Sequence, residues 1–127
     1  MKREKLIKKT IPQLIGLAVK YFHAYVRERD KDEPCISCGK FTTLECGHFY
    51  SAGHYPALRF DENNSAGQCK HCNQFLSGNL LEYRRGLINR KGVKVVEDLE
   101  IKAAYFKRTG YKWDRMALIE IIEKYSQ

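Results

Sequence analysis

The chain has 127 residues and a formal net charge of +8, which suits one domain with a single core and excludes two independently folded ones. The excess of Lys and Arg predicts a surface that attracts polyanions, of which nucleic acids are the commonest. We expect neither a secretory leader, because residues 1–9 are charged, nor a membrane span, so the five cysteines should be reduced thiols inside a cell.

Residues 1–34 are predicted to hold a basic lead-in and an amphipathic helix. The lead-in, residues 1–9, fits a frayed terminus and a phosphate-contacting arm about equally. Thr10 is a good N-cap residue, and apolar residues recur at three- and four-residue steps after it. A helix over about residues 10–29 follows, in which His23 is expected on the surface and not as a ligand.

The strongest motif is a pair of Cys-x-x-Cys sequences, Cys35/Cys38 and Cys69/Cys72. Two intervening residues let both sulfurs of a turn reach one ion, so two such turns can bind a tetrahedral structural Zn²⁺. His71 lies inside the second pair, but four thiolates make it unnecessary as a ligand. We expect residues 35–79 to fold around zinc, because so small a segment could not hold its shape alone.

The stretch between the cysteine pairs predicts two short strands. Residues 42–49 have the alternation of a strand, and residues 57–60 are expected to form the second one. The faces of the first strand would carry Leu44, Cys46 and His48 on one side and Glu45, Gly47 and Phe49 on the other. A short helix is predicted after Cys72 and before Gly78. Strand, loop, strand and helix, joined by a metal, outline a ββα finger.

Residues 80–127 are predicted to form about three helices. Asn79 can cap the first, which Gly92 ends; the second ends at Gly110, and Asp114 caps the last. The expected fold class is therefore α+β, a zinc-stabilised finger flanked by an N-terminal helix and these C-terminal helices. A dense positive cluster adjoins the finger, formed by Arg84, Arg85, Arg90, Lys91 and Lys94. We favour a DNA-backbone role for it over a solvated face.

Three positions resemble the His-Asn-His/Asn pattern of the HNH nucleases: Gly47-His48, Asn64, and Asn73 directly after Cys72. These nucleases belong to the ββα-metal superfamily, in which two Cys-x-x-Cys pairs often hold structural zinc. Longer stretches resemble the NinG (Rap) recombination proteins of lambdoid phages, namely Asp30–Gly39, Gly47–Phe49, Leu58–Asn64, Gln68–Gln74 and Ser77–Asn79. The likeness covers about residues 30–88, and the flanking helices are similar only in kind.

That resemblance implies a structure-selective endonuclease for branched recombination intermediates such as Holliday junctions, dependent on Mg²⁺ or Mn²⁺ and working in the cytoplasm of the phage's bacterial host. It implies His48 as the general base, Asn73 as the ligand of the catalytic metal and Asn64 as the residue that steadies the active-site loop. The cysteines would be structural. Because junction resolution usually needs two active sites, a homodimer is expected, with an interface that the sequence does not place.

The chain departs from the HNH pattern at Gly47, where many HNH nucleases carry an acidic metal ligand. Glu45 is the nearest acid, but strand alternation puts it on the opposite face from His48, so we do not expect it to bind the metal without a bulge. The spelling Glu-Cys-Gly-His instead resembles the Asp-Arg-Gly-His motif of nonspecific ββα-metal nucleases, where one asparagine is the sole protein ligand. Asp61 is a reserve ligand.

The chemistry also follows from the residue types. Phosphodiester hydrolysis needs a deprotonated water and a cation, and a neutral imidazole and a hard oxygen donor supply those roles. We expect the His48 ring and the Asn73 amide oxygen to face each other across a hydrated Mg²⁺. His54 also follows a glycine, but it lies in turn-like sequence and is the weaker candidate. Arg59 could contact the scissile phosphate or, equally, pair with Asp61 or Glu62.

Two rival interpretations stay open. A zinc module could bind nucleic acid without cutting it, with the histidines and asparagines only satisfying loop backbone groups. An RNA-associated zinc ribbon would fit the charge but leaves the long insert between the cysteine pairs unexplained. Cleavage that falls in acid would favour the nuclease, because an unperturbed histidine has a pKa of about 6.5.

Overall fold

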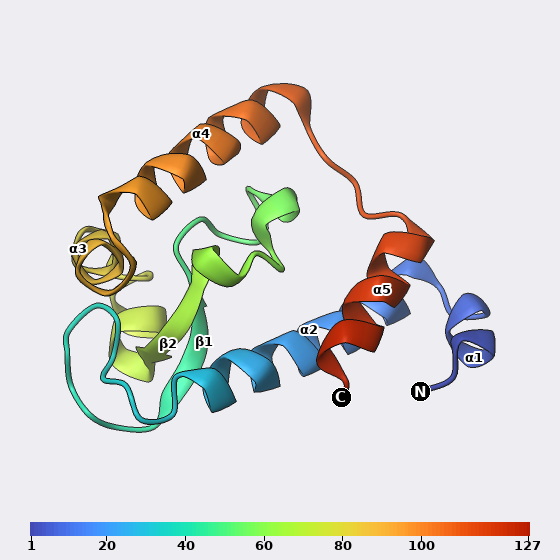
Figure 1. Cartoon of the computed structure of the whole chain (residues 1–127), viewed down its shortest axis with the longest axis horizontal. Coiled ribbons are helices and arrows are strands. Elements are labelled where there is room, and N and C mark those ends of the chain that lie inside the picture. The colour runs from blue at the N-terminus through green and yellow to red at the C-terminus, as the bar shows by residue number, and fades with distance from the viewer.

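A two-stranded antiparallel sheet lies between two groups of helices in the computed structural model, which describes residues 1–127 (Figure 1). Its strands are β1 (Leu44–His48) and β2 (Ser65–Cys69), paired so that Glu45 faces Gln68 and His48 faces Ser65. The expected α+β class is confirmed. No helix combines the length and the apolar character that crossing a membrane requires.

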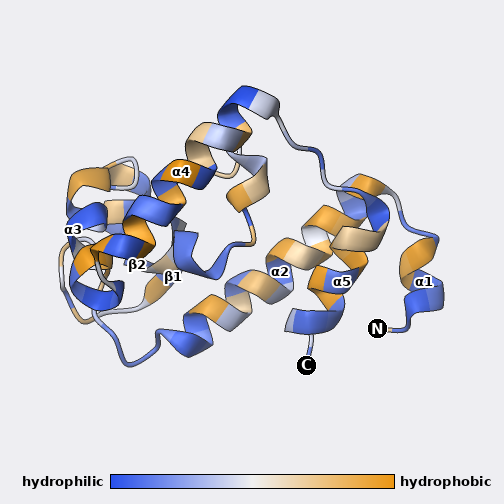
Figure 2. Ribbon diagram, turned by 45° about the horizontal axis from the view of Figure 1, so that its top comes forward, coloured by the Kyte–Doolittle hydropathy of each residue, from blue (hydrophilic) through white to orange (hydrophobic).

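The helices α2 (Ile11–Arg29) and α5 (Arg115–Tyr125) pack against each other on one side of the sheet. Thr10 begins α2 with a capping box, and the Asp114 side chain caps α5, so both predicted starts are confirmed. Their apolar faces meet where orange residues gather in Figure 2. The buried residues there are Leu14, Ala18, Phe22 and Val26 of α2 and Leu118, Ile119, Ile122 and Tyr125 of α5. Each large apolar side chain contributes roughly 1.5–3 kcal/mol.

The helices α3 (Leu80–Lys91) and α4 (Val93–Thr109) cover the other side. Gly92 ends α3 and Gly110 ends α4, with positive φ angles of +97° and +77°. Both predicted helix ends are therefore confirmed. The Tyr83 hydroxyl of α3 is fully buried and donates to the Gly47 carbonyl oxygen at 2.7 Å. This contact fixes α3 against the strand that carries the candidate base.

The predicted strand over residues 57–60 is wrong. Two 3₁₀ turns, η1 (Pro56–Leu58) and η2 (Glu62–Asn64), occupy that part of the chain, and the strand that pairs with β1 comes later. Pro56 favours a turn because its ring fixes φ and removes a backbone donor. The true strand is small and polar in composition. It is held by pairing with β1 and by the buried Asp30 carboxylate, which accepts from the Gly67 N–H at 2.8 Å.

The ends of the finger and of the chain also carry structure that the sequence did not indicate. Residues 1–9 include a short helix, α1 (Arg3–Ile7), whose Leu6 is fully buried in the α2–α5 core. The helix predicted after Cys72 is a single π-helical turn, η3 (His71–Phe75). It follows the hairpin directly, so the order of strand, strand and helical turn holds with a later second strand.

Candidate metal centre and adjoining cavity

Four thiols from the two Cys-x-x-Cys turns, which we call knuckles, form a cluster. We call it the four-cysteine cluster. Its sulfur atoms all lie within 4.8 Å of one another, and they belong to Cys35, Cys38, Cys69 and Cys72. The Sγ atoms of Cys38 and Cys69 are 3.8 Å apart. Two sulfurs bound to one tetrahedral zinc at about 2.3 Å are separated by about 3.8 Å, so the cluster can hold a metal ion such as zinc.

Backbone and side-chain N–H groups point at these sulfurs, as the binding of thiolates requires. Cys38 N–H donates to Cys35 Sγ at 3.5 Å, Cys72 N–H to Cys69 Sγ at 3.4 Å, and the Asn79 amide to Cys72 Sγ at 3.5 Å. Burial by itself would raise the pKa of Cys35, but surrounding backbone N–H groups outweigh it and lower that pKa to about 7. Burial raises the pKa of Cys38, in the same turn, and raises that of Cys72 to about 12, so a metal ion would have to displace protons from these thiols.

His48, the last residue of β1, is oriented by a backbone carbonyl. Its Nε2 lies 2.9 Å from the Arg59 oxygen, and because a carbonyl only accepts, Nε2 carries the proton and Nδ1 keeps a free lone pair. Burial lowers the pKa of His48 from the ordinary 6.5, so the ring is neutral at pH 7.

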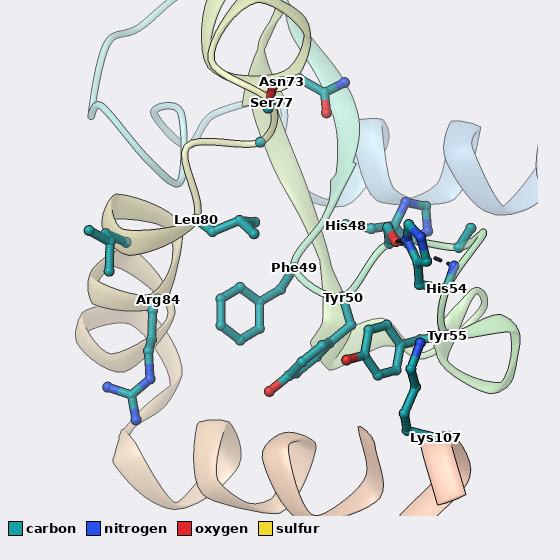
Figure 3. A pocket seen from close by; sticks show the side chains of 14 residues that line it. His48, Phe49, Tyr50, His54, Tyr55, Asn73, Ser77, Leu80, Arg84 and Lys107 are labelled. Atoms are coloured by element: carbon teal, nitrogen blue, oxygen red, sulfur yellow. Dashed lines mark hydrogen bonds between the residues drawn. The ribbon is translucent and has the colours of Figure 1, made fainter. Parts of the chain in front are cut away.

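Asn73 in η3 is oriented by a carboxylate. Its Nδ2 donates to Glu45 Oε1 at 2.9 Å, and Gln74 donates to the same carboxylate at 2.8 and 3.0 Å. A carboxylate only accepts, so the amide nitrogen of Asn73 must face it, and the amide oxygen is left for the cavity described below (Figure 3). The hydrogen bond from Asn73 is the main cause that lowers the pKa of Glu45. No hydrogen bond between Glu45 and Asn73 was predicted from the sequence.

The expected meeting of His48 and Asn73 across one ion is not what the structure shows. Asn73 contacts Glu45, and strand alternation puts Glu45 and His48 on opposite faces of β1. His48 turns instead toward α2, where its ring lies 5.7 Å from that of His23. His23 is half-buried, and burial followed by nearby positive charge lowers its pKa to about 4. It was expected on the surface.

Both residues nevertheless line one cavity of about 760 Å³ at the end of the hairpin (Figure 3). Its wall is largely aromatic and aliphatic, formed by Phe49, Tyr50, Tyr55, Leu80 and Leu81. Two cationic side chains lie at opposite edges of the same space: Arg84 of α3, which is paired with Glu100, and Lys107 of α4, which lies over the Tyr55 ring. The cavity thus combines an imidazole, an amide oxygen, edge-to-face aromatic rings and positive charge.

Asn64 holds together the loop that forms this wall. It is fully buried, and its Oδ1 accepts from the Tyr50 N–H at 2.8 Å. Its Nδ2 donates to the carbonyls of Tyr50 and Leu58, both at 3.0 Å. Three hydrogen bonds from one side chain tie η2 to the two ends of the loop, because its backbone groups would otherwise lie unpaired.

Gly47 leaves room that another residue fills. A Cβ atom at Gly47 would lie 2.1 Å from Oε1 and 2.9 Å from Cβ of Gln68. Gln68 is fully buried, donates to Ser37 Oγ at 2.9 Å and to the Gly78 carbonyl at 2.6 Å, and leaves Oε1 without a hydrogen-bond partner. An acid at position 47 would therefore displace Gln68, a residue that the sequence pattern did not indicate.

The weaker candidates lie apart from these groups. His54 is exposed at the cavity rim, with Nδ1 3.0 Å from Ser51 Oγ. Arg59 pairs with neither of the acids proposed for it, and its Nε has no hydrogen-bond partner. Asp61, the reserve metal ligand, is instead paired with Lys102 at 3.0 Å and belongs to no cluster of metal-ligand side chains.

The basic cluster predicted for DNA does not form one free face. Arg90 donates to the Pro34 carbonyl at 3.1 Å and Lys91 to the Glu62 carbonyl at 3.2 Å, so both connect segments of the protein. The others form ion pairs on the helix surface, Arg84 with Glu100, Arg85 with Glu82 and Lys94 with Asp98. Among the five, only Arg84 lines the cavity.

Comparisons with known proteins agree with the likeness seen in the motifs. A family model described as Bacteriophage Lambda NinG protein matches residues 1–127. Over 102 residues, or 79% of this chain, the chain is 45% identical to Protein ninG of Escherichia phage 933W, 44% to that of Salmonella phage P22 and 43% to that of Escherichia phage lambda. These alignments cover 51%, 50% and 50% of the relatives, so the chain spans about half their length. No solved structure matches the chain significantly.

Proposed function

The chain belongs to the bacteriophage lambda NinG family of phage recombination proteins, and from that membership we propose that it is a metal-dependent DNA endonuclease of the ββα-metal (HNH) type. Its substrate in this proposal is branched DNA, such as a Holliday junction, in the cytoplasm of the bacterial host. Cutting two strands at one junction requires two active sites, and a homodimer would supply them.

One observation carries the proposal: each of the two reactive groups is held by a hydrogen bond that frees the atom the reaction needs. The Arg59 carbonyl binds Nε2 of His48 and leaves Nδ1 as an acceptor for a water proton. The Glu45 carboxylate binds Nδ2 of Asn73 and leaves its amide oxygen as a ligand.

The donor set fits a hard divalent cation. The amide oxygen of Asn73 would hold Mg²⁺ or Mn²⁺, which keep several water ligands and need few from the protein. When bound, such an ion neutralises charge on the phosphate and the departing 3′ oxygen. His48 takes the proton of the attacking water at Nδ1, and its lowered pKa keeps it competent at neutral pH. The cavity gives space for a hydrated ion and a phosphate between groups on opposite faces of the strand.

The cavity wall favours a nucleic acid with accessible bases. Tyr50 contacts Phe49 and Tyr55 edge to face, at centroid distances of 4.9 and 4.8 Å, so the three rings form one aromatic cluster with faces in different directions. Bases stack on such rings without sequence preference, and Arg84 and Lys107 lie where phosphates would follow. Bases are more accessible at a branch point than in linear duplex, which supports a junction as substrate.

The test compares zinc-loaded parent protein with two histidine variants on a four-way junction and on a linear duplex of the same sequence, with and without Mg²⁺. His48→Ala should lower the cleavage rate about 10²- to 10⁴-fold, the usual contribution of a general base. His54→Ala, the other histidine after a glycine, should keep most of the rate. The parent's rate should fall with acidity only below pH 6.5, because burial lowers the pKa of His48 from that value.

The separation of His48 and Asn73 on two faces of β1 favours one other function, a zinc module that binds nucleic acid without cutting it. Parent protein that binds the junction but does not nick it with Mg²⁺ or Mn²⁺ would support that function and contradict the nuclease. Asn73→Ala separates them further, because it should abolish the response to Mg²⁺ only if Asn73 is a metal ligand. The molecular mass in gel filtration tests the homodimer.

A further inference from the structure

A second group of metal-ligand side chains lies on the α2 face of the hairpin, apart from the four-cysteine cluster. A ring nitrogen of His23, a ring nitrogen of His48 and Sγ of Cys46 all lie within 4.8 Å of one another. The planes of the two imidazoles are tilted by 52°, so neither ring stacks on the other. His23 comes from α2 and the other two from β1, so tertiary packing brings the three together.

The donor set is that of a transition metal. Two imidazoles and one thiol suit Zn²⁺ or Co²⁺ and are poor ligands for Mg²⁺, which prefers oxygen. Three protein ligands leave the fourth tetrahedral position for a water molecule. Ligand atoms around one zinc lie about 3.3–3.8 Å apart. The three ligand atoms lie within 4.8 Å of one another, so the present spacing needs a closure of about 1.5 Å at most, which side-chain rotation can supply.

The hydrogen bond at His48 is an independent sign of a metal ligand. Histidines that bind metals almost always donate their other ring N–H to a carbonyl or a carboxylate, which fixes the tautomer and the ring orientation. The Arg59 carbonyl provides this contact at 2.9 Å. Cys46 is only 8% exposed, whereas both histidines are partly exposed. Burial raises the pKa of the Cys46 thiol to about 12, so an ion bound here would have to displace its proton.

We propose that His23, Cys46 and His48 bind one Zn²⁺ or similar transition-metal ion, separate from the ion of the four-cysteine cluster. The bound ion would take the lone pair of His48 and so stop the proposed hydrolysis. The binding stands on the geometry of the three side chains alone. The inhibition rests on the proposed function.

Cobalt titration tests the binding. Protein with one zinc in the four-cysteine cluster is titrated with Co²⁺, and a second metal equivalent should give a near-ultraviolet sulfur-to-cobalt band with visible bands of a four-coordinate ion. Cys46→Ser should remove the sulfur-to-cobalt band, and His23→Ala should weaken cobalt binding at least about tenfold. His54→Ala, a histidine outside the group, should leave the spectrum unchanged.

Zinc content and circular dichroism of each variant show that the four-cysteine cluster and the helices are intact. A parent protein that binds no second equivalent would overturn the proposal. So would a sulfur-to-cobalt band that survives Cys46→Ser, because cobalt would then have replaced zinc in the four-cysteine cluster.

The inhibition is tested on cleavage in saturating Mg²⁺ with increasing Zn²⁺. The parent should lose its activity as the second site fills, and His23→Ala should need at least about ten times more Zn²⁺. Undiminished cleavage with the second site occupied would overturn the inhibition. If the parent does not cleave at all, the proposed nuclease fails, and the cobalt spectra still decide whether the site exists.

Discussion

The two faces of the β1–β2 hairpin are supported in different ways, and each face carries one half of the proposed active site. On the α2 face, Cys46 belongs to a core cluster of 11 buried residues, and His48 lies beside it. On the η3 face, hydrogen bonds hold Glu45 to Asn73 and Gln68 to Ser37. The four-cysteine cluster lies at the end of the hairpin away from His48, where Cys69 pairs with Leu44. Apolar contacts surround His48, the proposed base, whereas hydrogen bonds hold Asn73, the proposed metal ligand, beside Cys72.

This difference makes the two halves separable. Loss of the metal should release η3 and with it Asn73, while His48 stays in place against α2. Loss of apolar contact between α2 and α5 should act on the base and leave the four-cysteine cluster able to bind its ion. Each substitution below removes stabilising contacts on one face of the hairpin. Each measurement asks whether the structure on the other face is retained.

The largest effect is expected from Cys72→Ser, which removes a buried ligand of the four-cysteine cluster. Structural zinc provides about 10–16 kcal/mol in zinc-finger peptides, so the finger should lose most of its stability. Zinc content and thermal unfolding measure this loss. Cys46→Ser is the matched control, since the fifth cysteine lies outside the cluster and its substitution should leave the first zinc bound. Equal zinc loss in both variants would contradict the assignment.

Phe22→Ala disrupts the apolar core that α2 and α5 form on the other face of the hairpin. Phe22 is fully buried in α2 and touches Phe60 and Tyr125, with ring centroids at 5.6 and 5.0 Å. Truncating a buried phenylalanine costs about 3–5 kcal/mol, which denaturant unfolding of the zinc-loaded protein will measure. Zinc affinity should change little. A large fall in zinc affinity would show that the two faces are one cooperative unit.

Gly47→Ala tests the tight contact on the η3 face. The new Cβ would overlap Gln68, so we expect a loss of about 1–3 kcal/mol in the free energy of unfolding. Gly53→Ala is the control, because a Cβ there meets nothing within 4 Å. If both substitutions prove equally mild, Gln68 does not fill the space beside Gly47.

The smallest effect concerns pH and His23. Its folded pKa of about 4 lies below the unfolded value of 6.5, so the unfolded chain binds the proton more readily. The free energy of unfolding should therefore fall as pH drops below 6.5 and stop falling on this account below about 4. Because the ring is half-exposed, we expect a contribution of only about 1 kcal/mol between pH 7 and 5.

Urea unfolding of the parent and of His23→Gln at both pH values isolates this term, since the protonation of the cysteines is common to both proteins. Identical pH dependence in the two proteins would mean that His23 titrates normally in the folded state.

The features that the sequence predicted well are those encoded by neighbouring residues. Thr10 and Asp114 mark helix starts through contacts three residues away, and the spacing of each cysteine pair specifies a knuckle. The second strand was misplaced because Ser65–Cys69 has no β-branched or alternating pattern. Its pairing with β1 and its bond to Asp30 come from residues distant in the sequence.

The sequence indicated which residues lie at the cavity better than it indicated their contacts. His48, Asn64 and Asn73 all lie at the cavity or hold its wall, but their partners His23 and Glu45 could not be read from spacing. These partners depend on how α2 and η3 dock on the hairpin. Arg90 and Lys91 were assigned to DNA because charge was visible in the sequence, whereas the carbonyl groups that bind them were not.

The most direct test of this account is hydrogen–deuterium exchange of the zinc-loaded protein before and after removal of the metal by a chelator. The account predicts that residues 35–42 and 69–79 lose protection, while α2, α5 and the His48 end of β1 keep it. Uniform loss of protection along the chain, or no change in the knuckles, would contradict the claim that the two faces of the hairpin have separate supports.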